Sequence, residues 1–413
     1  MRVLFTTWGE VPRYSSVYGG QVLNVVEALQ NTKGIDRVTL LAGVPLIHSG
    51  FAREKFKYFD VVKKIKSRLG SENFFWRSLA VPPVGVNPQP YQLPMFTIGH
   101  INAGVKLIEE LRPDIVHCRY ILAAYIAHKW LEKSKHKFKI VFDTRSYMPE
   151  ESILMGRWKE DSEAHKFWQN IEAELLRKSD LVCVVSEEMR TRFEKIGTKR
   201  CELVYLNVAT TSSPPSKDIT EQNGPLKVVY CGALADGTWH SPELHWKVFS
   251  DIEKLRPGST FKVITKSNWA DLKKSLLLTG YGHLVDQVSF CSASTPAETV
   301  KMMRGSHVGL LSYRLPKTPL EITMAQGVFA TKTVEYLMAG VPVLVNNYCG
   351  GARHFVENHG VGASYQPEET LEKVTLDKLL LALNDKEKMF DLAKNNFSVD
   401  ENAKKLASFY SEL

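Results

Sequence analysis

Lys332 and Glu335 are the residues whose types and spacing best suit chemistry, and they lie three positions apart in TKTVEYLMAGVP at 331–342. The pattern predicts a helix that carries both side chains and ends at Gly340. An ionised carboxylate only accepts hydrogen bonds, so Glu335 could bind two hydroxyls of one sugar. The same spacing is typical of an ordinary amphipathic helix with a solvated lysine and glutamate, and it leaves both interpretations open.

Two glycine pairs could bind phosphate. Gly350 and Gly351 form a predicted turn after the apolar run 341–345, and Gly19 and Gly20 precede a helical pattern near the start of the chain. Glycine lets the backbone come close to a ligand, and free amides at a helix N-terminus favour negative charge. Such pairs also often serve only to close a loop, so this interpretation is open as well.

Another polar cluster follows the predicted strand 139–142 in FDTRSYMPEE. Ligands of open α/β proteins bind beyond the carboxyl ends of strands. Asp143 or Glu150 could accept a proton from an acceptor hydroxyl there, and Arg145 and Tyr147 are candidates for binding that acceptor. The alternative is an Asp–Arg loop pair that only shapes the turn.

His117 and Arg119 stand at the end of another predicted strand, 115–118, within RPDIVHCRY. Both are candidate catalytic residues, with Arg119 as a donor to an anion or a hydroxyl. A histidine on an apolar strand more often has a structural role, so His117 has two interpretations.

The segment KTVEYLMAGVPV resembles the nucleotide-sugar signature of family 4 glycosyltransferases, which have the GT-B fold. The resemblance implies that Glu335 binds the ribose of a donor nucleotide. Many members carry another glutamate eight positions earlier, beside the donor sugar, where this chain has Gly327. Lys332 matches a shortened variant of the signature, in which a lysine stands three positions before the retained glutamate.

Further segments resemble the same family. RPDIVHCRY resembles its P-D-hydrophobic-hydrophobic-His strand end, and FDTRSYMPEE resembles the D-x-R-x-x-x-P-E stretch of polysaccharide-type members. The loop with Gly19 and Gly20 corresponds to one that faces the donor diphosphate. Relatives have a cation soon after the Y-x-G-x-L that stands here at 230–234, whereas this chain has none. Lys266 is the expected substitute, and Arg314 is expected near the donor pocket.

Length and composition indicate a globular protein of more than one domain. The chain has 413 residues, which suits two domains of about 200 each. It has no apolar run of about 20 residues, and its start, MRVLFTTW, does not resemble a signal peptide. The six cysteines form no C-x-x-C pair and predict buried, reduced thiols of a cytoplasmic protein.

A basic and aromatic segment at 51–76 could bind an anionic membrane surface, and the net charge of +8 is compatible with anionic partners. Attachment would be peripheral, at the inner face of the cell membrane. The alternative is a solvated helix whose apolar side packs on its own domain. Nucleic acid is not an expected partner, because no recognition module accompanies the patch.

Strand and helix patterns alternate in two successive sets. They predict an α/β protein with two Rossmann-like, doubly wound parallel sheets that face a cleft. The first domain is expected at 1–208, a linker rich in Ser, Thr, Pro and Gly at 209–225, and the second domain at 226–395. The resemblance implies that the first domain binds the acceptor, that the second binds the donor, and that a final helix at 396–413 crosses back to the first.

The resemblance predicts a glycosyltransferase that moves a sugar from a UDP- or GDP-sugar to a hydroxyl of a glycan or lipid-linked glycan. Transfer would retain the anomeric configuration and serve surface polysaccharide biosynthesis, and no metal or other cofactor is expected. One alternative is a UDP-sugar 2-epimerase of GT-B architecture. Another is a degenerate, non-catalytic nucleotide-sugar-binding protein, which Gly327 and the missing cation after Gly232 favour.

Overall fold

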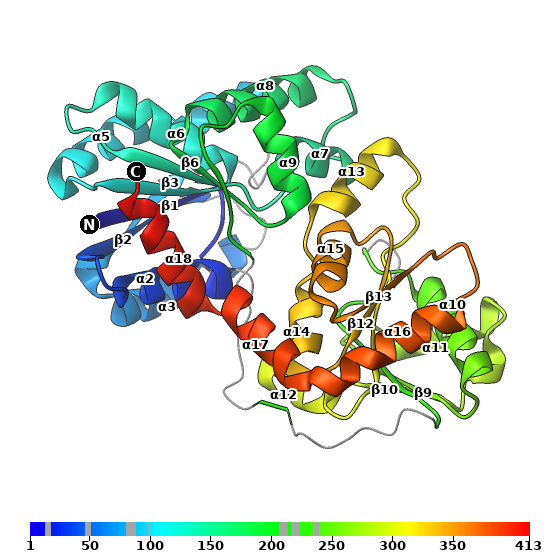
Figure 1. Cartoon of the computed structure of the whole chain (residues 1–413). Coiled ribbons are helices and arrows are strands. Elements are labelled where there is room, and N and C mark those ends of the chain that lie inside the picture. Colours follow the sequence, from blue (N-terminus) through cyan, green and yellow to red (C-terminus); the bar gives the residue numbers. More distant parts are fainter. Residues whose placement is uncertain are drawn as a thin grey trace. The chain divides into compact units, whose positions relative to one another are not determined.

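The protein, seen here as a computed structural model, consists of two compact units (Figure 1). The first unit is Met1–Asn207 together with Val399–Leu413, and the second unit is Val208–Ser398. Most of the predicted linker lies outside the described residues. The described residues are 1–12, 18–45, 51–79, 88–97, 99–205, 214–215, 224–234 and 239–413.

The first unit contains a seven-stranded sheet in the order β3-β2-β1-β4-β5-β6-β7, in which all neighbours pair in parallel. The order reverses between β1 and β4, and ligands of open α/β sheets bind at the carboxyl edge of such a switch point. Every residue of β4 is buried, as expected for a strand covered on both faces. The strands are β1 (Arg2–Trp8), β2 (Arg37–Pro45), β3 (Phe74–Leu79), β4 (Ile115–Arg119), β5 (Lys139–Asp143), β6 (Leu181–Val184) and β7 (Cys201–Leu203).

Helices separate these strands in the chain, as the predicted alternation requires. The last helix of the chain, α18, packs against α2 and so completes the first unit. The helical elements are η1 (Gly19–Leu23), α2 (Asn24–Gln30), α3 (Phe51–Leu69), η2 (Ser71–Asn73), η3 (Pro90–Gln92), α4 (Leu93–Thr97), α5 (His100–Leu111), α6 (Tyr120–Lys133), α7 (Met148–Leu154), α8 (Glu163–Lys178), α9 (Glu187–Ile196) and α18 (Val399–Ser411).

Helix α3, which carries most of the basic segment, packs its second half on the core of the first unit. Val62, Ile65 and Leu69 are buried there. The described half of the helix therefore uses its apolar side within its own domain, as in the second interpretation of this segment. The side chains of 51–59 lie outside the described residues. Among the helices that the structure describes, none has the length and apolar character needed to cross a bilayer.

The second unit contains a six-stranded parallel sheet in the order β10-β9-β8-β11-β12-β13, so its order reverses between β8 and β11. Its strands are β8 (Lys227–Cys231), β9 (Thr260–Ile264), β10 (Val288–Cys291), β11 (Val308–Leu311), β12 (Val343–Asn346) and β13 (Gly362–Tyr365). Its helical elements are α10 (Pro242–Leu255), α11 (Trp269–Leu278), η4 (Gly282–Leu284), α12 (Pro296–Met303), α13 (Pro319–Gly327), α14 (Thr331–Ala339), α15 (Gly350–His359), α16 (Lys373–Leu381), η5 (Ala382–Asp385) and α17 (Lys386–Phe397).

The predicted signature helix is α14, and it ends at Gly340 in the left-handed region with a φ of 71°. The buried strand β12 follows, as the apolar run predicts. The glycine pair after β12 corrects the prediction of a turn, because Gly350 and Gly351 are the first residues of helix α15. Close packing explains the glycine, since a Cβ at Gly350 would lie 2.4 Å from the carbonyl oxygen of Gln326.

Candidate functional site

A pocket of about 510 Å³ lies at the carboxyl ends of β8, β9 and β10 in the second unit, with α12 and α14 beside it. It brings together Lys266, Lys332 and Glu335, which come from distant segments of the chain. Parallel strands present their carboxyl ends at one edge of a sheet, which is where open α/β proteins bind ligands. The pocket is lined by Cys231, Gly232, Ala233, Ile264, Thr265, Lys266, Ser267, Ala293, Ser294, Thr295, Pro296, Thr299, Lys332 and Glu335.

Tyr336 fixes helix α14 on the sheet. Its hydroxyl donates to the carbonyl oxygen of Leu310 at 2.9 Å and accepts from the backbone nitrogen of Cys231 at 3.2 Å. The ring fits because residue 309 is glycine, where a Cβ would lie 2.6 Å from the ring. With Tyr336 buried against the sheet, the neighbouring Glu335 lies at the pocket.

Lys332 reaches the pocket across the backbone of Gly232. A Cβ at position 232 would lie 2.5 Å from Cε of Lys332, and Gly232 has a φ of 128°, which side chains rarely adopt. The glycine of the Y-x-G-x-L segment therefore leaves room for the lysine. This close approach depends on two segments about 100 residues apart, and the sequence pattern did not predict it.

Lys266 is placed by the loop that follows β9. The backbone nitrogen of Ser267 donates to Oγ1 of Thr265 at 3.0 Å, and the nitrogen of Leu234 donates to Oγ of Ser267 at 3.0 Å. These bonds join the loops after β8 and β9. Among the described residues, neither Lys266 nor Lys332 has an ion-pair partner within 4.0 Å. Two unpaired cations and one carboxylate suit a ligand that combines phosphate with hydroxyls.

The other predicted donor-binding residues lie elsewhere. Arg314 pairs with Glu321 at 2.9 Å and does not line the pocket. Gly350 and Gly351 begin α15, also outside the lining, and Gly19 and Gly20 open the helical turn η1 in the first unit. The structure thus brings together three of the eight predicted donor residues. The pocket lining also contains small polar residues that were not predicted, among them Cys231. Their positions at or just after the ends of strands are a signal from which the sequence could have predicted them.

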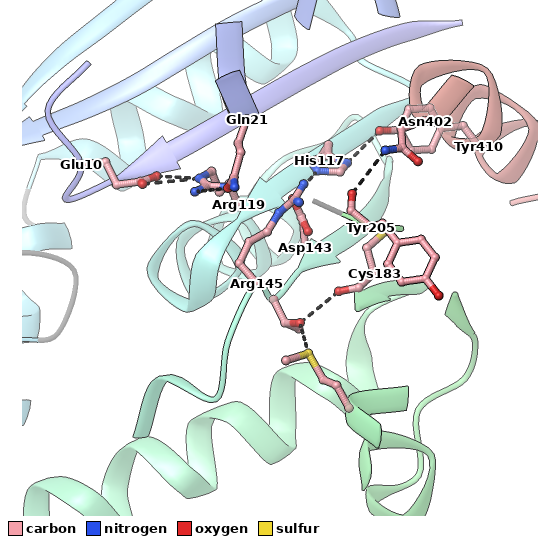
Figure 2. A network of polar contacts seen from close by, with 12 residues as sticks. Glu10, Gln21, His117, Arg119, Asp143, Arg145, Cys183, Tyr205, Asn402 and Tyr410 are labelled. Atoms are coloured by element: carbon pink, nitrogen blue, oxygen red, sulfur yellow. Dashed lines mark hydrogen bonds and ion pairs between the residues drawn. The ribbon is translucent and has the colours of Figure 1, made fainter. Parts of the chain in front are cut away.

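In the first unit, strand pairing places Arg119 opposite Asp143 at the carboxyl ends of β4 and β5. Figure 2 shows the resulting network of buried polar side chains. Asp143 Oδ2 accepts from Arg145 Nε at 2.6 Å and lies 3.4 Å from His117 Nε2. His117 Nδ1 lies 2.7 Å from the hydroxyl of Tyr410 on α18.

The protonation states in this network follow from its geometry. Burial alone would raise the pKa of Asp143, but the charge of Arg145 and the hydrogen bond from His117 outweigh it and lower that pKa to about 2. Burial lowers the pKa of His117, so the ring is neutral. Because ionised Asp143 only accepts, Nε2 of His117 donates to it, and Nδ1 accepts the O–H of Tyr410.

Both ring nitrogens of His117 are thus used inside the first unit, and the ring also stacks on Phe5 at 4.4 Å. The side chains of His117 and Asp143 are each 1% exposed. This geometry favours the structural interpretation of His117, as a link between the sheet and α18. It also places Asp143 in an ion pair with Arg145, as in the alternative interpretation of the loop. Their catalytic roles stay predictions.

Arg119 is held by other partners. Its Nε donates to Glu10 at 3.1 Å and its Nη2 to Gln21 at 3.1 Å. Within the described part of the chain, Nη1 of Arg119 and Nη1 of Arg145 are buried without a hydrogen-bond partner. Arg145 and Tyr120 both have positive φ, of 64° and 72°. Strained backbone and spare donors at strand ends are features that binding sites often share.

Glu150 and Tyr147 belong to a separate cluster formed by α7, α8 and α9. Glu150 pairs with Arg192, whose guanidinium lies 4.4 Å from the centre of the Tyr147 ring. Burial, and then the charge of Glu150, raises the pKa of Glu172 to about 8. Glu150 is 3% exposed and Tyr147 is 2% exposed, so both predicted site residues contribute to helix packing here. Their roles as base and acceptor-binding residue stay predictions.

Comparison with known proteins gives one family and several similar folds. Residues 60–211 match the family described as Glycosyltransferase Family 4. The structure is similar to the apo form of the lipopolysaccharide outer core galactosyltransferase WaaB, with a TM-score of 0.66 and 14% identity over 100% of both chains. It is also similar to HepE from Anabaena in complex with UDP-glucose, with a TM-score of 0.59 and 15% identity over 100% of both chains.

Sucrose-phosphate synthase from Thermosynechococcus elongatus has a TM-score of 0.61 and 12% identity, with 100% of this chain and 98% of that chain covered. No curated protein matches the chain in a sequence search. At these identities the structural likeness establishes the fold, and the family match indicates the activity. The protein therefore has the GT-B fold, and the match of residues 60–211 to Glycosyltransferase Family 4 supports a transferase activity.

Proposed function

We propose that this glycosyltransferase uses a nucleoside diphosphate sugar, UDP- or GDP-linked, and transfers the sugar with retention to a hydroxyl of a glycan or lipid-linked glycan. The observation that carries the donor assignment is the pocket of the second unit, in which Lys266, Lys332 and Glu335 meet. The two lysines would neutralise the diphosphate and the carboxylate would accept the ribose hydroxyls. HepE, which has a similar fold, was solved in complex with UDP-glucose.

The leaving nucleotide develops negative charge on its β-phosphate as the sugar departs. Fixed cations that stabilise this charge lower the barrier without a bound metal. Lys266 and Lys332 fulfil this role in the proposal, and the N-terminus of α12 adds the positive end of a helix dipole beside the pocket. Full activity after dialysis against EDTA is therefore expected.

The acceptor is proposed to bind the first unit near the carboxyl ends of β4 and β5. The spare donor atoms of Arg119 and Arg145 support this placement, since guanidinium groups bind hydroxyls and anionic groups of glycans well. WaaB, another protein of similar fold, is described as a lipopolysaccharide outer core galactosyltransferase. A role in surface polysaccharide biosynthesis is the corresponding proposal for this chain.

A thermal-shift panel of nucleoside diphosphates and their sugars tests the donor assignment. A ligand at 100 times its Kd adds about 2.7 kcal/mol, which for a unit of this size raises the Tm by roughly 5–10 °C. Glu335→Ala should abolish most of the shift, because charge-assisted hydrogen bonds to two hydroxyls contribute about 1.5–3 kcal/mol each. Glu369→Ala, at an exposed position outside the pocket, is the matched control. An unchanged shift in Glu335→Ala would refute the ribose assignment.

A turnover assay tests the reaction. The donor identified by the panel is incubated with and without lipid-linked or oligosaccharide acceptors, and the anomeric configuration of the product is read by NMR. Acceptor-dependent transfer with retention is expected. Conversion of the sugar nucleotide to its 2-epimer without acceptor would contradict the proposal in favour of an epimerase.

A further inference from the structure

We infer that Cys231 is a positioning residue, whose thiol holds the carboxylate of Glu335 in the orientation that receives the ribose. The inference rests on the proposed function, because ribose binding by Glu335 is itself proposed. Cys231 is the last residue of β8, lines the pocket and is 1% exposed. Its Sγ lies 3.1 Å from Oε2 of Glu335.

The direction of this hydrogen bond is set by chemistry. A carboxylate only accepts, so the S–H of Cys231 must donate to Glu335. Burial, and then the charge of Glu335, raises the pKa of the Cys231 thiol well above its usual value, so the thiol keeps the proton that it donates. An S–H group is a weak donor, but bonds to charged acceptors are stronger than bonds to neutral ones.

The bond leaves Glu335 able to bind a ligand. Each carboxylate oxygen offers about two acceptor positions, so Oε2 can take the thiol and a hydroxyl together. Among the described residues, no other group donates to Glu335, which lines the pocket, so Oε1 keeps both of its acceptor positions for a ligand. A diol such as the 2′- and 3′-hydroxyls of ribose could therefore engage both oxygens while the thiol restrains the side chain.

The surrounding structure makes the restraint effective. The backbone nitrogen of Cys231 donates to the hydroxyl of Tyr336, which in turn donates to Leu310 on β11. The start of the Glu335 side chain is therefore fixed relative to β8, and only its own torsions remain free. A free glutamate loses much rotamer entropy when it is ordered by a ligand, and an orientation set in advance reduces that loss.

The test compares ribonucleotides with their 2′-deoxy forms, because only the ribose contact distinguishes them. Kd values are measured by calorimetry for UDP, GDP and their 2′-deoxy counterparts in wild type, Cys231→Ala and Cys231→Ser. The preference for the ribonucleotide should fall about fivefold in Cys231→Ala, which corresponds to about 1 kcal/mol. It should be retained in Cys231→Ser, since a hydroxyl donates in place of the thiol. Cys231→Val, which fills the site of the thiol without a donor, should behave as the alanine variant does.

Controls separate positioning from general loosening. Cys291→Ala carries the same change at the end of β10, outside the pocket lining, and should keep the wild-type ratio. In a Glu335→Ala background, Cys231→Ala should change the ratio no further, because the thiol acts through that carboxylate.

Each outcome bears on a defined claim. An unchanged ratio in both Cys231→Ala and Cys231→Val would overturn this inference and leave the proposed function intact. An equal loss of preference in Cys291→Ala would also overturn it, since the effect would then be a general one. A wild-type protein that binds none of these nucleotides would overturn the proposed function, and this inference with it.

Discussion

Gly232 has two roles in the structure: it adopts a backbone conformation that side chains rarely adopt, and it leaves room for Lys332. Replacing Gly232 by alanine should affect stability through the first role and diphosphate binding through the second. The backbone there has a φ of 128°, and the added Cβ would lie 2.5 Å from Cε of Lys332. Carbon atoms in contact normally lie about 3.5–4.0 Å apart, so the lysine must move by about 1 Å or more. Lys332 is a flexible side chain, and its displacement from the pocket is the expected response.

The substitution should lower both the stability of the unit and its affinity for a diphosphate, and these two effects are measured separately. A side chain in a backbone region that favours glycine costs about 1–3 kcal/mol, which lowers the Tm of a unit of this size by roughly 2–12 °C. Loss of the Lys332 contact to a diphosphate removes a charge-assisted bond of about 1.5–3 kcal/mol, or roughly a 10- to 100-fold loss of affinity. The affinity for the nucleoside without phosphate should change little.

The loss of diphosphate affinity is measured by calorimetry with UDP and uridine, or with GDP and guanosine if the protein binds GDP. Gly305→Ala is the matched control, since Gly305 has a φ of 79° and an added Cβ would have no atom of the described residues within 4 Å. It should lower the Tm without loss of diphosphate affinity. In a Lys332→Ala background, Gly232→Ala should weaken diphosphate binding no further. A Gly232→Ala protein with wild-type affinity for the diphosphate would refute the contact between these two residues as the basis of phosphate binding.

Three further predictions concern other parts of the chain. Because the pKa of Glu172 is raised from 4.5 to about 8, the folded state holds a proton that the unfolded state has lost, and stability should fall as pH rises from about 4.5 to 8. Glu172→Gln should flatten that decline, measured as the free energy of unfolding from urea titrations at several pH values. An unaltered dependence of stability on pH would contradict the raised pKa of Glu172. Tyr410→Phe should lower the free energy of unfolding by about 1–3 kcal/mol, because it leaves the buried Nδ1 of His117 without its donor; a stability equal to that of wild type would count against this link. Lys266→Ala should weaken diphosphate binding but not nucleoside binding, whereas Lys273→Ala, at an exposed position on α11, should weaken neither.

Local patterns in the sequence were enough to predict the architecture. The alternation of apolar strand runs with amphipathic helices predicts two parallel sheets, and both are present. The signature helix and its end at Gly340 were also predictable, since the helical period and a glycine in the left-handed region act over a few neighbouring residues. The position of Glu335 on that helix follows directly.

Long-range packing decided which candidate residues share a site. Lys266, in the loop after β9, and Lys332, at the start of α14, line one pocket at the carboxyl edge of the sheet, and no local spacing encodes this proximity. Packing also determined which polar groups are taken by internal partners, as with Glu150 and Arg192.

His117 shows the same difference between what local patterns predict and what long-range packing determines. A histidine on an apolar strand of a parallel sheet was predictable from the local pattern. The hydrogen-bond partners of its two nitrogens, Asp143 and Tyr410, lie 26 and 293 residues away along the chain and became evident only from the folded protein. Burial and hydrogen-bond partners arise from contacts between distant segments, whereas helix and strand periods arise from neighbours along the chain.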